Sequence, residues 1–390
     1  EEQLDHSGGG GLPRRLLLVG LGGASSDLAL GVWRAELRTI DLLAERGAWC
    51  RLRAGLPLDN LLSWTSLLSG LDAGQLGVYG PSYRVNRNDL PPQPVDSRAI
   101  RDPRLWDLFG AAGKHVGVVG APATTPAPAV SGHLVGDRLS PDGAPATFPA
   151  ALAQQVTAWL GNAALAPVEP QRGNIDALVQ AAYVRAEERF LLARRLLARD
   201  TYDCFVLVDD GIASVQHALW HAFDPAHPRY TPDHPFAGAI GAFYRFVDDQ
   251  LFELLELVDD ETVVVIASVG GASALRGEFA LNEWLIEQGE LVLRTAPSEP
   301  RPAAQSDIDW ERTRAWAGDG GALYVNIAGR EPHGIVPTDQ AEHVRAQLIE
   351  RLRALRTPDD EPMLEVYRPE VLYPVRQGVA PDLLVVGAQP

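Results

Sequence analysis

The stretch that decides the fold is Tyr202–Tyr230, which reads YDCFVLVDDGIASVQHALWHAFDPAHPRY. Its first part is apolar and rich in β-branched residues, so it predicts a buried strand that ends at Asp209 and Asp210. A helix is expected next, with His217 and His221 four residues apart on one face. Because ligands in open α/β sheets lie at the carboxyl ends of strands, we expect a site here. Taken alone, the two histidines are more typical of a half-buried helix face.

Apolar runs that alternate with helical segments continue on both sides of this stretch. The expected strands are Leu16–Leu21, Trp49–Ala54, His115–Val119, Glu261–Ala267, Ala322–Ile327, Met363–Tyr367 and Ala380–Gly387. The alternation predicts an α/β fold with a central, mostly parallel sheet and helices on both faces.

An insertion and an N-terminal arm complete the predicted organisation. Residues 121–200 are expected to form a loop and helical insertion, because their first part is rich in Pro, Gly and Ala and is expected to form loops. Helical segments follow at Phe148–Leu160 and Asn174–Leu197. Residues 1–12 end in glycines and are expected to form a flexible arm, and residues 12–390 to form one α/β domain.

The composition disfavours several classes of protein. Hydrophobic residues make up 46% of the 390 residues and charged residues 22%, as in globular proteins. Lys and Arg number 34 and Asp and Glu number 51, so the net charge is −17, which disfavours binding to nucleic acid. No apolar run approaches the ~20 residues that a membrane span needs. We expect a cytoplasmic protein that is not bound to a membrane, and a homo-oligomer or a protein partner stays open.

Two local patterns are expected to carry no cofactor and no redox function. Gly20–Gly23 follows a strand, but the third glycine position of a dinucleotide fingerprint is occupied by Ser25, so we expect no such cofactor. Cys50 and Cys204 lie in apolar runs and are expected to be two buried thiols rather than a disulfide.

Several segments resemble one family, in the order in which that family carries them. WTSLLSGLDAGQLGVYG at residues 64–80 resembles the "WTS…TG…G.HG" segment of the type I phosphodiesterase/nucleotide pyrophosphatase branch of the alkaline phosphatase superfamily. SVQHALWHAFDPAHPRY at residues 214–230 resembles its Asp-x-x-x-His metal segment, and residues 104–122, 274–293 and 322–336 resemble its other blocks. The resemblance implies an alkaline phosphatase-like sandwich with two divalent metals at the strand ends and a Thr or Ser nucleophile.

The residues at the functional positions of that family depart from its pattern. The metal-binding Asp after the first strand is replaced by Gly22, the nucleophile by Asn60, and the Asp of the Asp-x-x-x-His segment by Ala213. The Asp-His pair at a later strand end falls on Val269 and Gly270. Because a catalytic zinc needs about three protein ligands, the resemblance with these replacements implies that no metal is bound.

Polar side chains still occupy the inherited site. His217 is expected to act as a general acid or base near neutral pH, oriented by Asp210, while Asn60 donates and accepts hydrogen bonds. The residues expected to bind the substrate, a small organic molecule, are Asp59, Trp64, His221, Tyr79 and Tyr83. Simpler explanations exist for single residues: Asn60 as a helix cap, Trp64 as part of the core.

Three functions stay open. The first is a metal-independent acid–base enzyme, of the cyclase, lyase or hydrolase type, that acts on an organic biosynthetic intermediate. The second is a non-catalytic pseudoenzyme that binds a ligand or a partner protein. The third is a metal-dependent phosphodiesterase that uses Asp209, Asp210 and His221 as substitute ligands. We rank them in this order, because substitute ligands would be needed for most of the metal site.

Overall fold

A computed structural model of the chain divides into two units, each of which is described by itself. The described residues are 15–88, 92–161, 174–295, 299 and 304–388, so the predicted flexible arm lies outside them. The first unit comprises residues 1–52 and 105–274, and the second comprises residues 53–104 and 275–390.

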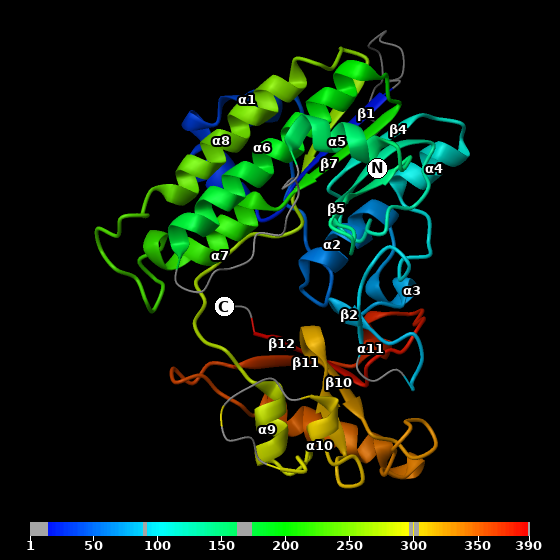
Figure 1. The fold of residues 1–390 in the computed structure, drawn as a ribbon. Helices are drawn as coiled ribbons and strands as arrows, with labels where there is room; N and C mark the ends of the chain where they lie inside the picture. Colours follow the sequence, from blue (N-terminus) through cyan, green and yellow to red (C-terminus); the bar gives the residue numbers. More distant parts are fainter. Residues whose placement is uncertain (1–14, 89–91, 162–173, 296–298, 300–303, 389–390) are drawn as a thin grey trace, which may run out of the picture. The chain divides into compact units, whose positions relative to one another are not determined.

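The first unit contains a six-stranded sheet in the order β6-β5-β4-β7-β1-β8 (Figure 1). Its strands are β1 (Arg15–Leu21), β4 (Val116–Val119), β5 (Gly132–Leu139), β6 (Pro145–Phe148), β7 (Cys204–Asp209) and β8 (Thr262–Ala267). β7 pairs in parallel with β1 and β4, and only the edge strand β6 runs antiparallel. All six residues of β7 are buried, which explains its continuous apolar run, because strands inside a parallel sheet are covered on both faces.

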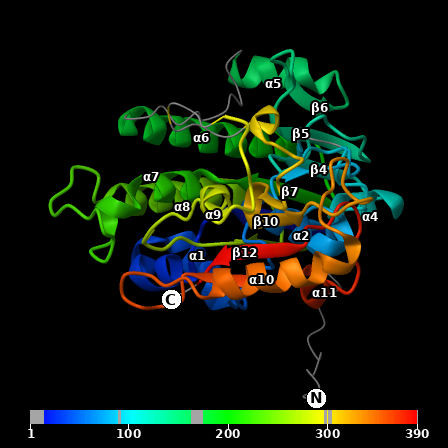
Figure 2. The ribbon, with the colours of Figure 1, turned by 90° about the horizontal axis from the view of Figure 1, so that it is seen from below.

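Helices flank this sheet, so the predicted mostly parallel α/β sheet is confirmed. The helices are α1 (Arg38–Arg46), α4 (Leu105–Ala111), α5 (Leu152–Leu160), α6 (Ile175–Arg199), α7 (Gly211–Phe223) and α8 (Ala239–Leu255), with short helical turns at Leu28–Val32 and Arg34–Glu36. α6, α7 and α8 lie side by side (Figures 1 and 2). Their side chains Phe190, Leu219 and Phe243 share one core with Phe205 and Leu207 of β7.

The second unit contains a four-stranded antiparallel sheet in the order β11-β12-β10-β9 and a short hairpin, β2-β3. Its strands are β2 (Ser82–Tyr83), β3 (Gln93–Pro94), β9 (Ala315–Ala317), β10 (Ala322–Val325), β11 (Leu364–Tyr367) and β12 (Leu383–Gly387). Its helices are α2 (Asn60–Ser69), α3 (Ala73–Leu76), α9 (Leu281–Glu287), α10 (Ala341–Arg353) and α11 (Pro369–Leu372), with helical turns at Gln305–Asp307, Asp319–Gly321 and Thr338–Gln340. Leu348 of α10, Leu285 of α9 and Leu323 of β10 are buried in its core.

Three predictions about residues 49–149 are wrong. Trp49–Ala54 forms no strand, and Trp49 is 56% exposed. Cys50 was predicted to be buried but is exposed, whereas Cys204 is buried as predicted. An apolar run becomes a strand only where a neighbouring strand pairs with it, and no strand in the described part of the chain pairs with this one. The segment expected to form loops, residues 121–149, contains β5 and β6. Pro145 opens β6 at the edge of the sheet, where a missing backbone N–H is tolerated.

The described residues include no helix of the length and hydrophobicity that crossing a membrane requires.

Candidate functional site

The carboxyl ends of β1 and β7 meet side by side, because Leu21 pairs with Asp209. Beyond them, the backbone N–H of Gly22 donates to the carbonyl oxygen of Asp209 at 2.8 Å, and that of Ala213 donates to the carbonyl oxygen of Gly22 at 3.0 Å. Gly23 has a φ of +82°, and a Cβ there would lie 2.7 Å from the Cα of Ala213. The turn after β1 therefore packs directly on the first turn of α7 and requires glycine at position 23.

Asp210 fills the space beside Gly22. A Cβ built on Gly22 would lie 1.9 Å from Oδ1 of Asp210, well inside any normal contact. The carboxyl group of Asp210 thus occupies the volume into which a side chain at position 22 would project. An aspartate at position 22, as the family pattern implies, is incompatible with this conformation of Asp210.

Asp209 forms a buried ion pair with Arg189. Its side chain is 1% exposed, its Oδ1 lies 3.4 Å from Nη1 of Arg189 on α6, and its Oδ2 accepts the backbone N–H of Gly211 at 2.9 Å. Burial raises the pKa of Asp209, and the charge of Arg189 opposes that shift. The pair joins α6 to the start of α7, so we assign Asp209 a structural role.

Arg185 lies one helical turn before Arg189 and carries a second positive charge near this strand end. Burial, reinforced by the charge of Arg189, lowers the pKa of Arg185 to about 10, while the carboxylates of Glu188, Asp209 and Asp210 act in the opposite direction. The guanidinium therefore stays protonated at neutral pH. No hydrogen bond or ion pair joins it to another described residue, and its Nη2 is buried without an acceptor.

Neither arginine was predicted from the sequence, although a signal was present for Arg189. Arg189 falls on the apolar stripe of α6, in register with the buried residues Ala182, Ala186, Ala193 and Leu196. A charged residue in such a stripe indicates a buried partner, because a buried charge is retained only when it is paired.

The predicted histidines lie on α7 without the expected arrangement. His217 is exposed and makes no hydrogen bond or ion pair with Asp210 within the described part of the chain. His221 is partly buried, and its ring centroid lies 5.3 Å from that of His234 and 6.1 Å from that of His227. Burial and the neighbouring His234 lower the pKa of His221.

The other predicted residues belong to the second unit. Asp59 caps α2, because its Oδ1 accepts the backbone N–H of Leu62 at 2.9 Å. Asn60 is the exposed first residue of the helix, so its alternative assignment as the helix cap is wrong. Trp64 on α2 is 0% exposed.

Tyr79 and Tyr83 line one small cavity, and the structure thus brings these two predicted residues together. Tyr79 is 4% exposed, and its hydroxyl donates to the carbonyl oxygen of Gln377 at 2.9 Å. Burial raises the pKa of Tyr79 to about 12, so its phenol is neutral at physiological pH.

The residues at the strand ends do not fit the two metal ions that the family pattern implies. Gly22, Ala213, Val269 and Gly270 offer no ligand atoms in their side chains. Asp209, at the carboxyl end of β7, is paired with Arg189. Within the described ranges, no group of three or more His, Cys, Asp or Glu side chains is arranged to hold a metal ion.

Comparisons with known proteins identify the relatives of this chain. The model of the family "Type I phosphodiesterase / nucleotide pyrophosphatase" matches residues 16–389. No curated protein sequence matches. Among solved structures, phosphonoacetate hydrolase from Sinorhizobium meliloti 1021 in complex with phosphonoacetate is similar, with 16% identity and a TM-score of 0.57, covering 96% of this chain and 81% of that one. The same enzyme with phosphonoformate gives 17% identity and a TM-score of 0.59 at the same coverage. At these identities the likeness concerns the fold alone.

Proposed function

Since this chain belongs to the type I phosphodiesterase/nucleotide pyrophosphatase family, as its sequence led us to expect, we propose that it is a metal-independent member that binds an anionic organic molecule where β1 and β7 end. The observation that carries the proposal is Arg185, a protonated guanidinium that makes no hydrogen bond or ion pair with a described residue. Fold alone supports no particular activity, so Arg185 and its neighbours carry the proposal.

The charges at the strand end favour an anion. Arg189 is neutralised by Asp209, whereas Arg185 makes no hydrogen bond or ion pair with a described residue. A guanidinium binds carboxylate or phosphate oxygens through two parallel N–H donors. An organic acid or a phosphonate would satisfy this guanidinium.

Turnover of that ligand by acid–base chemistry is the second candidate function, and the exposure of His217 favours it. Its imidazole has no partner in the described structure, so both ring nitrogens are open to a substrate. An imidazole near neutral pH can accept or donate a proton without a metal ion. A metal-dependent phosphodiesterase with substitute ligands is less well supported, because Asp209 is already paired with Arg189.

The experiment combines metal analysis with ligand titration. We expect negligible metal in the purified chain and no change in melting temperature with zinc or manganese. Phosphonoacetate, the ligand of the similar structure, is the first probe for anion binding, followed by hydroxy and amino acids. A rise in melting temperature should be lost in Arg185→Gln and kept in Arg195→Gln, a control at an exposed position of the same helix.

Two results would overturn this proposal. Stoichiometric tightly bound metal with chelator-sensitive cleavage of an activated phosphodiester would restore the phosphodiesterase function. An equal ligand-induced rise in melting temperature in Arg185→Gln and in Arg195→Gln would show that Arg185 is not part of the binding site. For the second candidate, a substrate found by screening should lose its turnover, but not its binding, in His217→Ala.

A further inference from the structure

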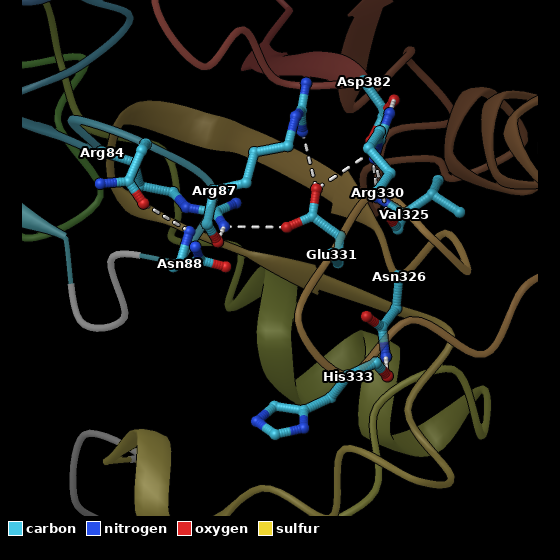
Figure 3. Close-up of polar contacts among 10 residues, drawn as sticks. Arg84, Arg87, Asn88, Val325, Asn326, Arg330, Glu331, His333 and Asp382 are labelled. Carbon is cyan, nitrogen blue, oxygen red and sulfur yellow. Dashed lines mark hydrogen bonds and ion pairs between the residues drawn. The ribbon is translucent and has the colours of Figure 1, made fainter.

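Each unit contains a network of charged side chains that the proposed function does not use. In the second unit, the buried carboxylate of Glu331 accepts from Nη2 of Arg84 at 2.8 Å and from Nη1 of Arg87 at 2.7 Å (Figure 3). In the first unit, a network at the amino ends of β4 and β5 contains the side chain of His133. Histidine is the residue type whose ordinary pKa lies nearest to neutral pH, so the charge of this second network can change on mild acidification.

The hydrogen bonds of His133 require a neutral imidazole. Its Nε2 lies 2.8 Å from Nη2 of Arg199, the last residue of α6. A guanidinium has only donors, so Nε2 is the acceptor, and Nδ1 carries the ring proton and donates it to the hydroxyl oxygen of Tyr202 at 3.0 Å. Burial, followed by the charge of Arg199, lowers the pKa of His133. The stability that the neutral network contributes is therefore present above about pH 6.5 and is lost as the pH falls through the lower, folded value.

Arg199 connects α6 to two other elements of the first unit. Besides its contact with His133 of β5, its Nη1 donates to Oε1 of Gln155 on α5, and its guanidinium lies 5.9 Å from the ring centroid of Trp159 on the same helix. Its Nε donates to Oδ2 of Asp200 at 2.7 Å. Arg199 thus holds the last turns of α5 against the edge of the sheet that β5 and β6 form (Figures 1 and 2).

The charges around His133 oppose one another. The titratable and charged groups on the elements packed around it are Lys114, His115, Arg199, Asp200, Tyr202 and Asp203. α5 and β6 carry no titratable side chain. Arg199 and the ring of His115, whose centroid lies 5.6 Å from that of His133, disfavour a positive imidazole, whereas Asp200, with Oδ2 at 3.7 Å from Nδ1, favours it.

We propose that His133, Arg199 and Asp200 form an acid-sensitive latch, in which protonation of His133 displaces Arg199 and releases the last turns of α5 from the sheet. A proton on Nε2 would place an N–H donor against the N–H donor of Arg199 and bring two positive charges within 2.8 Å. Asp200, which now accepts from Arg199, can then accept from the imidazolium instead. The latch lies at the amino ends of the strands and does not depend on the anion site proposed at Arg185.

The test measures backbone hydrogen exchange in the full chain at about pH 7.5 and about pH 5, corrected for the intrinsic exchange rates. Protection of α5 should fall by about tenfold, the change that loss of one hydrogen bond to a charged group produces, while protection of α8 stays the same. His133→Gln keeps an acceptor for Arg199 but takes up no proton, so the fall should disappear. His343→Gln, at an exposed position of α10, should keep it.

An equal fall in His133→Gln, or no fall in the unmodified chain, would overturn the proposal. If His133→Gln does not fold, Arg199→Met tests the latch from its other side. In that variant α5 should already be weakly protected at the higher pH and should lose no further protection on acidification. A fall in α5 protection that persists in Arg199→Met would refute the latch.

Discussion

Substitution of Gly22 by alanine tests the packing of the strand-end site. The added Cβ would lie 1.9 Å from Oδ1 and 3.0 Å from Cγ of Asp210, but 3.3 Å from its Cα. The backbone can therefore stay almost in place, while the carboxyl group must rotate away. Forced side-chain rearrangement of this kind costs about 1–3 kcal/mol, and the lower entropy of unfolded alanine returns about 0.4–1 kcal/mol. We expect a net loss of about 1–2 kcal/mol.

The assay is a double-mutant cycle with Asp210→Ala, followed by urea and thermal unfolding. Removal of the carboxyl group should make room for the methyl group, so that Gly22→Ala costs less than about 0.5 kcal/mol in that background. The cycle cancels the change in unfolding free energy that Asp210→Ala causes through the other contacts of Asp210. For a unit of this size the single substitution should lower the melting temperature by roughly 2–8 °C.

Gly31→Ala is the matched control, because a Cβ at Gly31 meets nothing within 4 Å. It should raise the unfolding free energy by about 0.4–1 kcal/mol, because only the entropy gain applies there. A neutral Gly22→Ala variant, or equal effects of that substitution with and without Asp210, would refute the inference that the Asp210 carboxyl group fills the space of a side chain at position 22.

Two further predictions concern buried and exposed charges. Arg189→Met should lower the unfolding free energy by about 3–5 kcal/mol in urea titrations, because it leaves the Asp209 carboxylate buried and unpaired; a loss no greater than that of Arg195→Met would contradict this. The backbone N–H of His115 lowers the pKa of Asp203, so the stability this carboxylate contributes is present above its unfolded pKa of about 3.9 and is lost as the pH falls through the folded value. Asp203→Asn should flatten the fall in urea midpoint below about pH 4, and parallel curves for both proteins would argue against it.

Local sequence patterns were sufficient for the family and for most elements of the first unit, although not for β5 and β6. The apolar run before Asp209 predicted β7, and Asn174, which caps α6 through its side chain, marked the start of that helix. Such signals are short-range, since hydrophobic periodicity and capping depend on neighbours within a few residues. Trp49–Ala54 has the apolar character of a strand but lacks a partner strand, which no local pattern reveals.

The roles of the carboxylates at the strand end depended on contacts between distant segments. Because side chains alternate between the two faces of a strand, Asp209 lies on the same face of β7 as Phe205 and Leu207, which pack against the helices. There it contacts Arg189, which lies 20 residues earlier in the chain. Asp210, the next residue, lies instead against Gly22, in the turn that follows β1. The linear sequence therefore established the fold and the family, because those depend on residue type and order. Which charged groups are paired was settled by tertiary packing, since burial and close approach arise only when the segments come together.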